Sequence, residues 1–222
     1  MLIPREIGPY AVLRPIAKGG LAEVYEVEDP ATGEHHAIKL LIHSGKAVQR
    51  FNREYKIITT INHPNILRVY RYGIHRGQPW IAMELLDGVA LQTHVKSIGP
   101  PGHPDRTQEA LRIGWFLASA LGYLHGRGLI HRDIKSANAV VLPDGRVKLL
   151  DFGTAHIIDA AETLTRSEEF VGTFAYASPE QIQSHEIDGR SDIYALGVLM
   201  YRLSAGRRPF ESTDNAELVR MH

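Results

Sequence analysis

The residues best suited to chemistry lie close together in the second half of this 222-residue chain. The run His-Arg-Asp-Ile-Lys-Ser-Ala-Asn occupies positions 131–138, and Asp-Phe-Gly follows at 151–153. The apolar residues on either side of the Pro-Asp-Gly at 143–145 predict a short hairpin. Such a hairpin would bring Asn138 and Asp151 together at one edge, where their side-chain oxygens could hold a divalent cation.

The elements that must position this segment begin with strands. β-branched and apolar residues alternate through most of the first third, which predicts strands separated by turns. The expected strands are Tyr10–Ala17, Ala22–Glu28, His36–Leu41, Leu67–Tyr72 and Trp80–Leu85. A helical period runs through Ala47–Ile61 and stops at His63-Pro64.

After Asp87-Gly88 the pattern becomes predominantly helical. Residues 97–106, rich in Pro and Gly, predict an exposed loop, and Thr107 is expected to cap a helix over Gln108–Gly126. The expected core positions of that helix are Leu111, Trp115, Leu117, Ala118, Leu121 and Leu124. Further helices are expected over Ser191–Leu203, with Gly206 as its stop, and over Asn215–His222.

Composition narrows the functional classes. The chain is 44% hydrophobic and 23% charged, as in an ordinary globular protein, and its 25 Lys and Arg balance 25 Asp and Glu. This balance argues against nucleic acid as a partner. The absence of cysteine excludes disulfides and thiolate chemistry, and fits the cytoplasm or the cytoplasmic portion of a larger protein. No apolar run approaches the length of about 18 residues that a spanning helix needs, so no membrane segment is expected within this chain.

The order of Asp133, Lys135, Asn138 and the Asp-Phe-Gly resembles the catalytic segments of protein kinases. The runs Gly-Gly-Leu-Ala-Glu-Val-Tyr, His-Pro-Asn-Ile and Ser-Pro-Glu-Gln make the chain most similar to bacterial Hanks-type (eukaryotic-like) serine/threonine kinases. The resemblance implies an α+β, two-lobed fold with an ATP cleft between a small, mainly β N-lobe and a larger, mainly α C-lobe. Its implied extents are one kinase domain over 1–222, with the N-lobe at about 10–83, the hinge at 84–89 and the C-lobe at 90–222.

The resemblance also implies the roles of the catalytic residues. Asp133 would accept the proton of the substrate hydroxyl, and Lys135 would steady the γ-phosphate of ATP. Asn138 and Asp151 would hold Mg²⁺ or Mn²⁺. Lys39, in Ala-Ile-Lys on the third expected strand, would hold the α- and β-phosphates with Glu54 as its ionic partner.

The same resemblance implies a nucleotide site. Its members are Ile16, Ala17, Lys18, Gly19 and Gly20 in the phosphate loop, Val24, Ala37 and Val140 around the adenine ring, and Met83, Glu84 and Leu86 at the hinge. The loop departs from the family's glycine pattern, because Ala17 and Ala22 replace the first and third glycines and only Gly19 matches.

The segment after Asp-Phe-Gly resembles an activation segment. Thr163, Thr165 and Ser167 lie in a polar stretch and are the expected phosphorylation sites, where a phosphate could pair with Arg132. Residues 173–180 resemble the stretch that shapes a peptide site in the family, with Thr173 positioning the substrate, so protein substrates are expected. Asp192 matches a buried family residue that braces the catalytic loop.

Two other functions stay open on the sequence. A pseudokinase, a nucleotide-binding scaffold that signals by contacts, is favoured by Ala17, Ala22 and the missing last helices. It is opposed by Asp133, Asn138 and Asp151 together. A small-molecule phosphotransferase of similar architecture is disfavoured by residues 173–180.

The chain also lacks the last helices that kinase domains carry, so a fragment of a longer protein is expected. Glu180 would then be buried without its arginine partner, which predicts low thermal stability, self-association or stabilisation by a partner.

Overall fold

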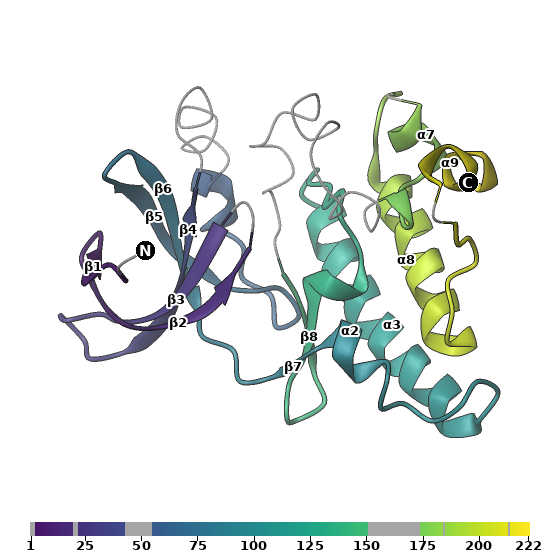
Figure 1. Cartoon of the computed structure of the whole chain (residues 1–222), viewed down its shortest axis with the longest axis horizontal. Helices are drawn as coiled ribbons and strands as arrows, with labels where there is room; N and C mark the ends of the chain where they lie inside the picture. The colour runs from purple at the N-terminus through teal and green to yellow at the C-terminus, as the bar shows by residue number, and fades with distance from the viewer. Residues whose placement is uncertain (1–2, 20–21, 43–54, 151–173, 184, 213) are drawn as a thin grey trace. The chain divides into compact units, whose positions relative to one another are not determined.

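The computed structural model describes residues 3–19, 22–42, 55–150, 174–183, 185–212 and 214–222 (Figure 1). By its internal contacts the chain divides into two units. The first comprises residues 1–62 and 67–87, and the second comprises residues 63–66 and 88–222.

The first unit is built on a six-stranded sheet in which every neighbouring pair is antiparallel, in the order β1-β2-β3-β4-β6-β5. The strands are β1 Glu6–Ile7, β2 Tyr10–Lys18, β3 Ala22–Glu28, β4 His35–Leu41, β5 Val69–His75 and β6 Gln78–Glu84. All but β1 were expected from the alternation of apolar residues, with ends shifted by a few positions. A strand of two residues is too short to give a periodic signal.

Trp80 organises the core of this unit. Its ring meets Tyr10 edge to face, with centroids 5.7 Å apart. Gly8 and Gly73 lie so close to the indole that a Cβ on either would stand 2.6 Å from Trp80 Cζ2. Only glycine permits this approach, so both positions are fixed by packing. The buried cluster consists of Ile7, Tyr10, Tyr25, Val27, Ile38, Leu40, Trp80 and Ala82.

The helix expected over Ala47–Ile61 is described only at its end. Residues 55–58 are helical, and Tyr55, Ile58 and Ile61 are buried. These are three of the positions that the helical period placed on one face. The rest of that helix lies outside the described residues.

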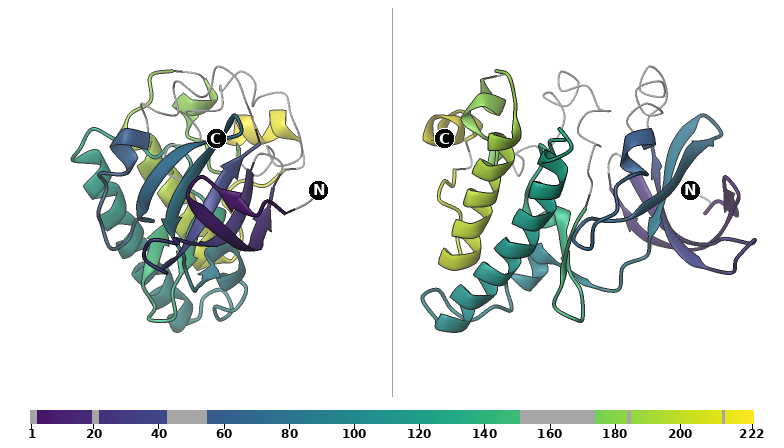
Figure 2. Two further views of the ribbon diagram at one scale, coloured as in Figure 1. Left: turned by 90° about the vertical axis from the view of Figure 1, so that its left-hand side faces the viewer. Right: turned by 180° about the vertical axis from the view of Figure 1, so that it is seen from behind.

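The second unit combines a small antiparallel sheet with helices. Its elements are β7 Val89–Ala90, α2 Leu91–His94, α3 Pro104–His125, the 3-10 turn η1 Ser136–Asn138, β8 Ala139–Val141, β9 Val147–Leu149, α7 Pro179–Ile182, α8 Gly189–Ala205 and α9 Asn215–Met221. The two long helices, α3 and α8, pack side by side (Figure 2). The expected hairpin around 143–145 is present as β8 and β9, with Ala139 opposite Leu149.

The start of α3 corrects the sequence prediction. The helix begins at Pro104, inside the stretch expected to be a loop, and its cap is His103, whose side chain accepts a hydrogen bond from the Asp105 amide. Proline suits the first turn of a helix, because its missing N–H has no partner to lose there. Thr107 therefore lies within the helix and caps nothing.

The buried face of α3 also differs from the expected one. Leu111 and Trp115 are 63% and 65% exposed, and Ala118 is exposed as well. Three of the expected core positions, Leu117, Leu121 and Leu124, are completely buried. The apolar residues of this helix occupy more than one face, and only part of that surface is covered.

Helix α8 ends where its sequence predicts. Gly206 adopts a left-handed conformation with φ of 75°, and its amide donates to the Arg202 carbonyl. This αL cap satisfies a carbonyl that the helix end would otherwise leave without a donor. In the ranges that the structure describes, no helix is both long and apolar enough to cross a membrane.

Candidate active site

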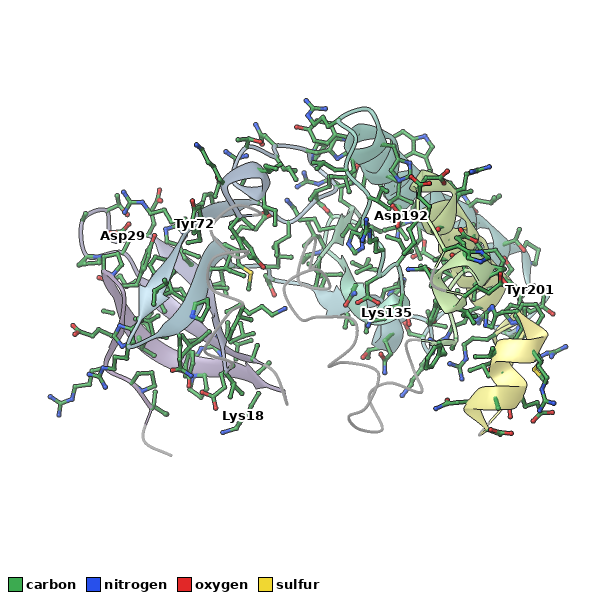
Figure 3. The ribbon with its side chains drawn as sticks, turned by 90° about the horizontal axis from the view of Figure 1, so that it is seen from above. Lys18, Asp29, Tyr72, Lys135, Asp192 and Tyr201 are labelled. Atoms are coloured by element: carbon green, nitrogen blue, oxygen red, sulfur yellow. The ribbon has the colours of Figure 1, made fainter. Side chains whose placement is uncertain are left out.

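Asp192 of α8 fixes the loop that precedes β8. The Asp192 carboxylate is fully buried and accepts hydrogen bonds from the amides of His131 at 2.8 Å and Arg132 at 2.7 Å. His125 Nε2 of α3 lies 2.8 Å from the same carboxylate. Asp192 therefore joins both long helices to the backbone of the catalytic loop, as the sequence predicted for a brace. Asp192 and Lys135 are labelled in Figure 3.

Arg132 holds an uncommon backbone conformation, with φ of 67°. A left-handed residue other than glycine costs on the order of 1–3 kcal/mol unless its surroundings impose it. Here Asp192 holds the Arg132 amide, and Gln181 Nε2 donates to the Arg132 carbonyl at 2.9 Å. Gln181 is itself held by a reciprocal capping box with Ser178 at the start of α7. The turn that presents Asp133 is thus fixed on both sides.

The two oxygens of Asp133 have different surroundings. Oδ2 lies 2.8 Å from Lys135 Nζ and accepts a hydrogen bond of 2.7 Å from Asn138 Nδ2. Among the described residues, no donor reaches Oδ1. Since the carboxylate is anchored through one oxygen, the other is presented as a proton acceptor.

The Asn138 side chain is oriented by the same contacts. Its Nδ2 donates both to Asp133 Oδ2 and to the Asp133 carbonyl at 2.9 Å. The reverse amide orientation would place an oxygen against two acceptors, so the hydrogen bonds decide the assignment. Asn138 Oδ1 then has no donor within the described part of the chain and can serve as a metal ligand.

Leu150, the residue before Asp151, has both its backbone amide and its carbonyl in hydrogen-bonding contacts. The Leu150 amide donates to the Asn138 carbonyl at 2.8 Å, and the Leu150 carbonyl lies 2.9 Å from His131 Nε2. His131 Nδ1 accepts from the Asp133 amide, so the hydrogen bonds assign the neutral Nε2–H tautomer. The loop thereby fixes the point at which the chain enters the Asp-Phe-Gly segment.

A polar network that the sequence did not reveal lies behind the loop. Arg202 Nη1 of α8 donates to Ser136 Oγ at 2.8 Å and to Tyr176 Oη at 2.7 Å. Ser136 and Tyr176 are buried, whereas Arg202 is half-buried. The only signal in the sequence was an arginine that follows the apolar run Ile193–Tyr201, and this signal does not identify the partners of Arg202.

In the first unit, Lys39 lies on β4 between two neighbouring strands. Its cross-strand neighbours are Val24 on β3 and Ile81 on β6. Ala37 lies two positions earlier, opposite Met83, and is 5% exposed. The sheet register therefore places Val24, Ala37, Lys39 and Met83 on three neighbouring strands.

Strands β2 and β3 pair up to positions 18 and 23, and residues 20–21 between them lie outside the described residues. Ala17 pairs with Val24, and the Gly19 amide donates to the Ala22 carbonyl at 2.9 Å. Lys18, at the end of β2 in Figure 3, lies 2.7 Å from Glu23 Oε1, and this contact lowers the pKa of the Glu23 carboxyl. Ile16 is 44% exposed, so apolar surface adjoins this loop.

At the end of β6, Glu84 is engaged with Arg68. The Glu84 amide donates to the Arg68 carbonyl at 2.9 Å, while Glu84 Oε1 accepts from the Arg68 amide at 2.6 Å. The backbone of Leu86 makes no hydrogen bond with any described residue. In the second unit, Val140 pairs with Ala90 and is partly exposed.

Several of the expected site residues lie outside the described residues. They are Gly20, Glu54, Asp151, Thr163, Thr165, Ser167 and Thr173. Within the described ranges, no three His, Asp or Glu side chains gather as metal ligands.

Glu180 corrects a further prediction, because it is half-buried and has a partner. Ser191 Oγ donates to the Glu180 carboxylate, and this hydrogen bond lowers the pKa of that group. Ser191, in the first turn of α8, supplies the partner, so the carboxylate is not left unpaired.

A model of the protein kinase domain matches residues 10–222. The chain belongs to the protein kinase family. The kinase is 36% identical over 221 residues to the serine/threonine-protein kinase PknF of Mycobacterium tuberculosis, which covers 96% of this chain and 46% of PknF. It is 35% identical over 227 residues to the serine/threonine-protein kinase PrkC of Bacillus subtilis, which covers all of this chain and 34% of PrkC.

A solved structure shows the same fold. The crystal structure of the Mycobacterium tuberculosis PknI kinase domain, determined for a single-residue mutant, matches with a TM-score of 0.75 and 31% identity, over 100% of this chain and 85% of that chain. The expected resemblance to bacterial serine/threonine kinases and the expected α+β kinase fold are confirmed. The kinase spans less than half the length of the two curated relatives.

Proposed function

We propose that the kinase transfers the γ-phosphoryl group of ATP to serine or threonine hydroxyls of protein substrates. The observation that carries the proposal is the Asp133 carboxylate, which is anchored by Lys135 and Asn138 through Oδ2 and has no partner at Oδ1 among the described residues. A carboxylate fixed in this way can orient a hydroxyl and take its proton.

The reaction would proceed by in-line transfer. The substrate hydroxyl donates to Asp133 Oδ1 while its oxygen forms a bond to the γ-phosphorus. The bond from that phosphorus to the bridging oxygen breaks, ADP leaves, and the proton passes through Asp133 to solvent. The Lys135 ammonium, 2.8 Å from Asp133, would steady the γ-phosphate during transfer.

Asn138 Oδ1 and Asp151 would hold Mg²⁺ or Mn²⁺. The donor set fits, because Asn138 presents an oxygen that no described donor engages, and hard cations prefer oxygen ligands. When bound, the ion would neutralise charge on the phosphates.

The first unit would supply the remaining nucleotide contacts. Lys39, with Glu54 as its partner, would hold the α- and β-phosphates, and the backbone of Glu84 and Leu86 would bind the adenine edge. The residues proposed around the phosphates and the ring are Ile16, Ala17, Lys18, Gly19, Gly20, Val24, Ala37, Met83, Glu84 and Val140. We place the activity in the cytoplasm, or in the cytoplasmic portion of a larger protein.

The substitution Asp133→Asn tests this proposal. Loss of the proton acceptor should lower radiolabelled phosphate transfer to generic acidic and basic proteins by about 10²–10⁴-fold. ATP affinity should stay close to that of the wild type, because Asp133 is assigned to the hydroxyl and not to the nucleotide. Asp144→Asn is the matched control, since this exposed carboxylate lies in the β8–β9 turn and pairs with Arg146.

A pseudokinase would bind ATP yet give equally low transfer with the wild type and with Asp133→Asn. A transfer rate that is high and unchanged by Asp133→Asn would remove the assigned role of this residue.

We further propose that phosphorylation of Thr163, Thr165 or Ser167 activates the kinase, and that Thr173 positions the substrate. Incubation with ATP and magnesium should add phosphate between residues 159 and 171, detectable by mass spectrometry, and phosphatase treatment should then lower activity. An enzyme that is unmodified in this segment and fully active would contradict the proposal.

A further inference from the structure

Arg202 carries a positive charge that no carboxylate in the described part of the chain neutralises. Its two hydrogen bonds go to Ser136 Oγ and Tyr176 Oη, both neutral groups, and no carboxylate of the described residues pairs with it. Four other arginines of the second unit have acidic partners, whereas the buried Arg106 donates only to backbone carbonyls, which carry no charge. The acidic pairs are Arg112 with Glu109, Arg146 with Asp144, Arg190 with Asp188, and Arg208 with Glu211.

A half-buried charge is normally compensated, because it has lost part of its hydration. Both hydrogen bonds of Arg202 come from Nη1. The opposite edge of the guanidinium, formed by Nε and Nη2, donates to no described residue, and neither nitrogen is fully buried without a partner. That edge is the planar fork that binds carboxylate and phosphate through two parallel hydrogen bonds.

The position of this fork relates it to the reaction. Ser136, which Arg202 contacts, lies three residues after Asp133 and directly after Lys135. Three residues of chain span at most about 11 Å. An extended peptide rises about 3.3 Å per residue, so an anion at Arg202 would belong to a side chain about two to four residues from the reacting hydroxyl.

We propose that Arg202 is a specificity-determining residue, which favours protein substrates with a carboxylate or phosphate about two to four residues from the modified serine or threonine. The inference rests on the proposed function and adds a substrate class to it. Tyr176, the second partner of Arg202, belongs to residues 173–180, which we expect to contact the substrate peptide. Ser136 and Tyr176 hold the guanidinium in place, and its free edge carries the selectivity.

The experiment compares peptides that differ in one side chain. Each peptide carries one serine, with Glu, Gln or Lys placed in turn at each position from two to four residues away. For the wild type, kcat/KM should be about three- to tenfold higher with Glu than with Gln at the best position, mainly through KM. The preference should shrink as salt rises from about 0.05 M to about 0.5 M.

Three variants assign the preference to Arg202. Arg202→Gln keeps a donor for Ser136 and Tyr176 but removes the charge, so the ratio of Glu to Gln peptides should fall to about one. Arg202→Glu should favour Lys over Gln peptides. Arg190→Gln, at the exposed start of the same helix, should leave the wild-type ratio unchanged.

Each contrary outcome has a separate meaning. Equal wild-type kcat/KM for Glu and Gln peptides at every position overturns the specificity proposal while leaving the kinase activity intact, and this holds even if the variants fail to fold. Absence of transfer to any peptide or protein overturns the proposed function instead. If Arg202→Gln slows all peptides equally and phosphatase treatment of the wild type does the same, Arg202 binds a phosphate of the kinase itself, and the substrate proposal is wrong.

Discussion

At the scale of single residues, the surroundings of two aspartates in the second unit give one a structural role and suit the other to catalysis. Asp192 is completely buried, and both of its oxygens accept hydrogen bonds from the catalytic loop. Asp133 is 23% exposed at its side chain and has one oxygen engaged. Only a carboxylate with a free acceptor can take a proton, so the two residues cannot exchange roles.

Asp192→Ala should lower the stability of the kinase strongly. The substitution leaves the amides of His131 and Arg132 without their acceptor, and each buried unsatisfied donor costs about 1–3 kcal/mol. We expect the free energy of unfolding in urea to fall by about 2–5 kcal/mol. Asp105→Asn, at an exposed position in the first turn of α3, should change it by less than about 0.5 kcal/mol. Equal effects of the two substitutions would show that Asp192 is not a brace.

At the scale of elements, the sequence predicted turns and one helix end, but it did not predict which apolar faces other elements cover. The β8–β9 hairpin and the stop at Gly206 follow from turn residues at fixed positions, and both are present. The first turn of α3 was missed, because His103 is an unusual cap and the prolines before it favoured a loop. The exposure of Trp115 could not be read from spacing, since an apolar residue looks the same whether or not another element covers it.

The candidate site shows the same division. The spacing of Asp133, Lys135 and Asn138 predicted residues that the structure brings into direct contact. Partners supplied by α8, such as Arg202 for Ser136 and Ser191 for Glu180, cannot be predicted from the sequence around the residue that they contact. Such pairings depend on how α8 packs, which no local pattern encodes.

The His63 side chain should make the free energy of unfolding depend on pH. The ring lies against Tyr123 with centroids 4.9 Å apart, and its Nδ1 accepts from the Asn65 amide. Burial, followed by the charges of Lys148 and Arg127, lowers the pKa of His63 below its ordinary value. Because the folded-state pKa lies below the unfolded one, the stabilisation is complete above about pH 6.5 and is lost as the pH falls from there through the folded-state pKa.

His63→Gln tests this dependence, because glutamine does not titrate. Between about pH 7.5 and pH 5.5, the free energy of unfolding should fall more in the wild type than in the variant, by at most about 1.4 kcal/mol per pH unit. NMR titration of the His63 ring should give a pKa below that of a histidine peptide. A value at or above the peptide's would contradict the expected sign.

At the scale of the whole molecule, apolar side chains remain exposed on both long helices. Leu111 and Trp115 of α3 are 63% and 65% exposed, and Ile193 and Tyr201 of α8 are 53% and 42% exposed. Burying apolar surface gains about 25 cal/mol per Å². Two side chains four residues apart on α3 therefore form a surface that would be stabilised by contact with a second copy.

The double substitution Leu111→Gln and Trp115→Gln should weaken self-association. Sedimentation velocity over a range of concentrations should show association of the wild type and less of it in the variant. Ile74→Gln, which changes a 45% exposed residue of β5, is the control. The chain has two tryptophans, and Trp80 is buried, so acrylamide quenching at increasing concentration reports on Trp115. Concentration-independent quenching and sedimentation would contradict the prediction.

The position of residues 63–66 determines how the chain can be divided into its two units. These residues belong to the second unit, where the Leu149 amide donates to the Asn65 carbonyl, Asn65 Nδ2 donates to the Val147 carbonyl, and Ile66 is 3% exposed. The polypeptide therefore passes between the units three times, after positions 62, 66 and 87. Residues 1–87 alone therefore contain the whole first unit together with four residues of the second, and residues 88–222 alone lack those four. No single cut separates the two units with both complete.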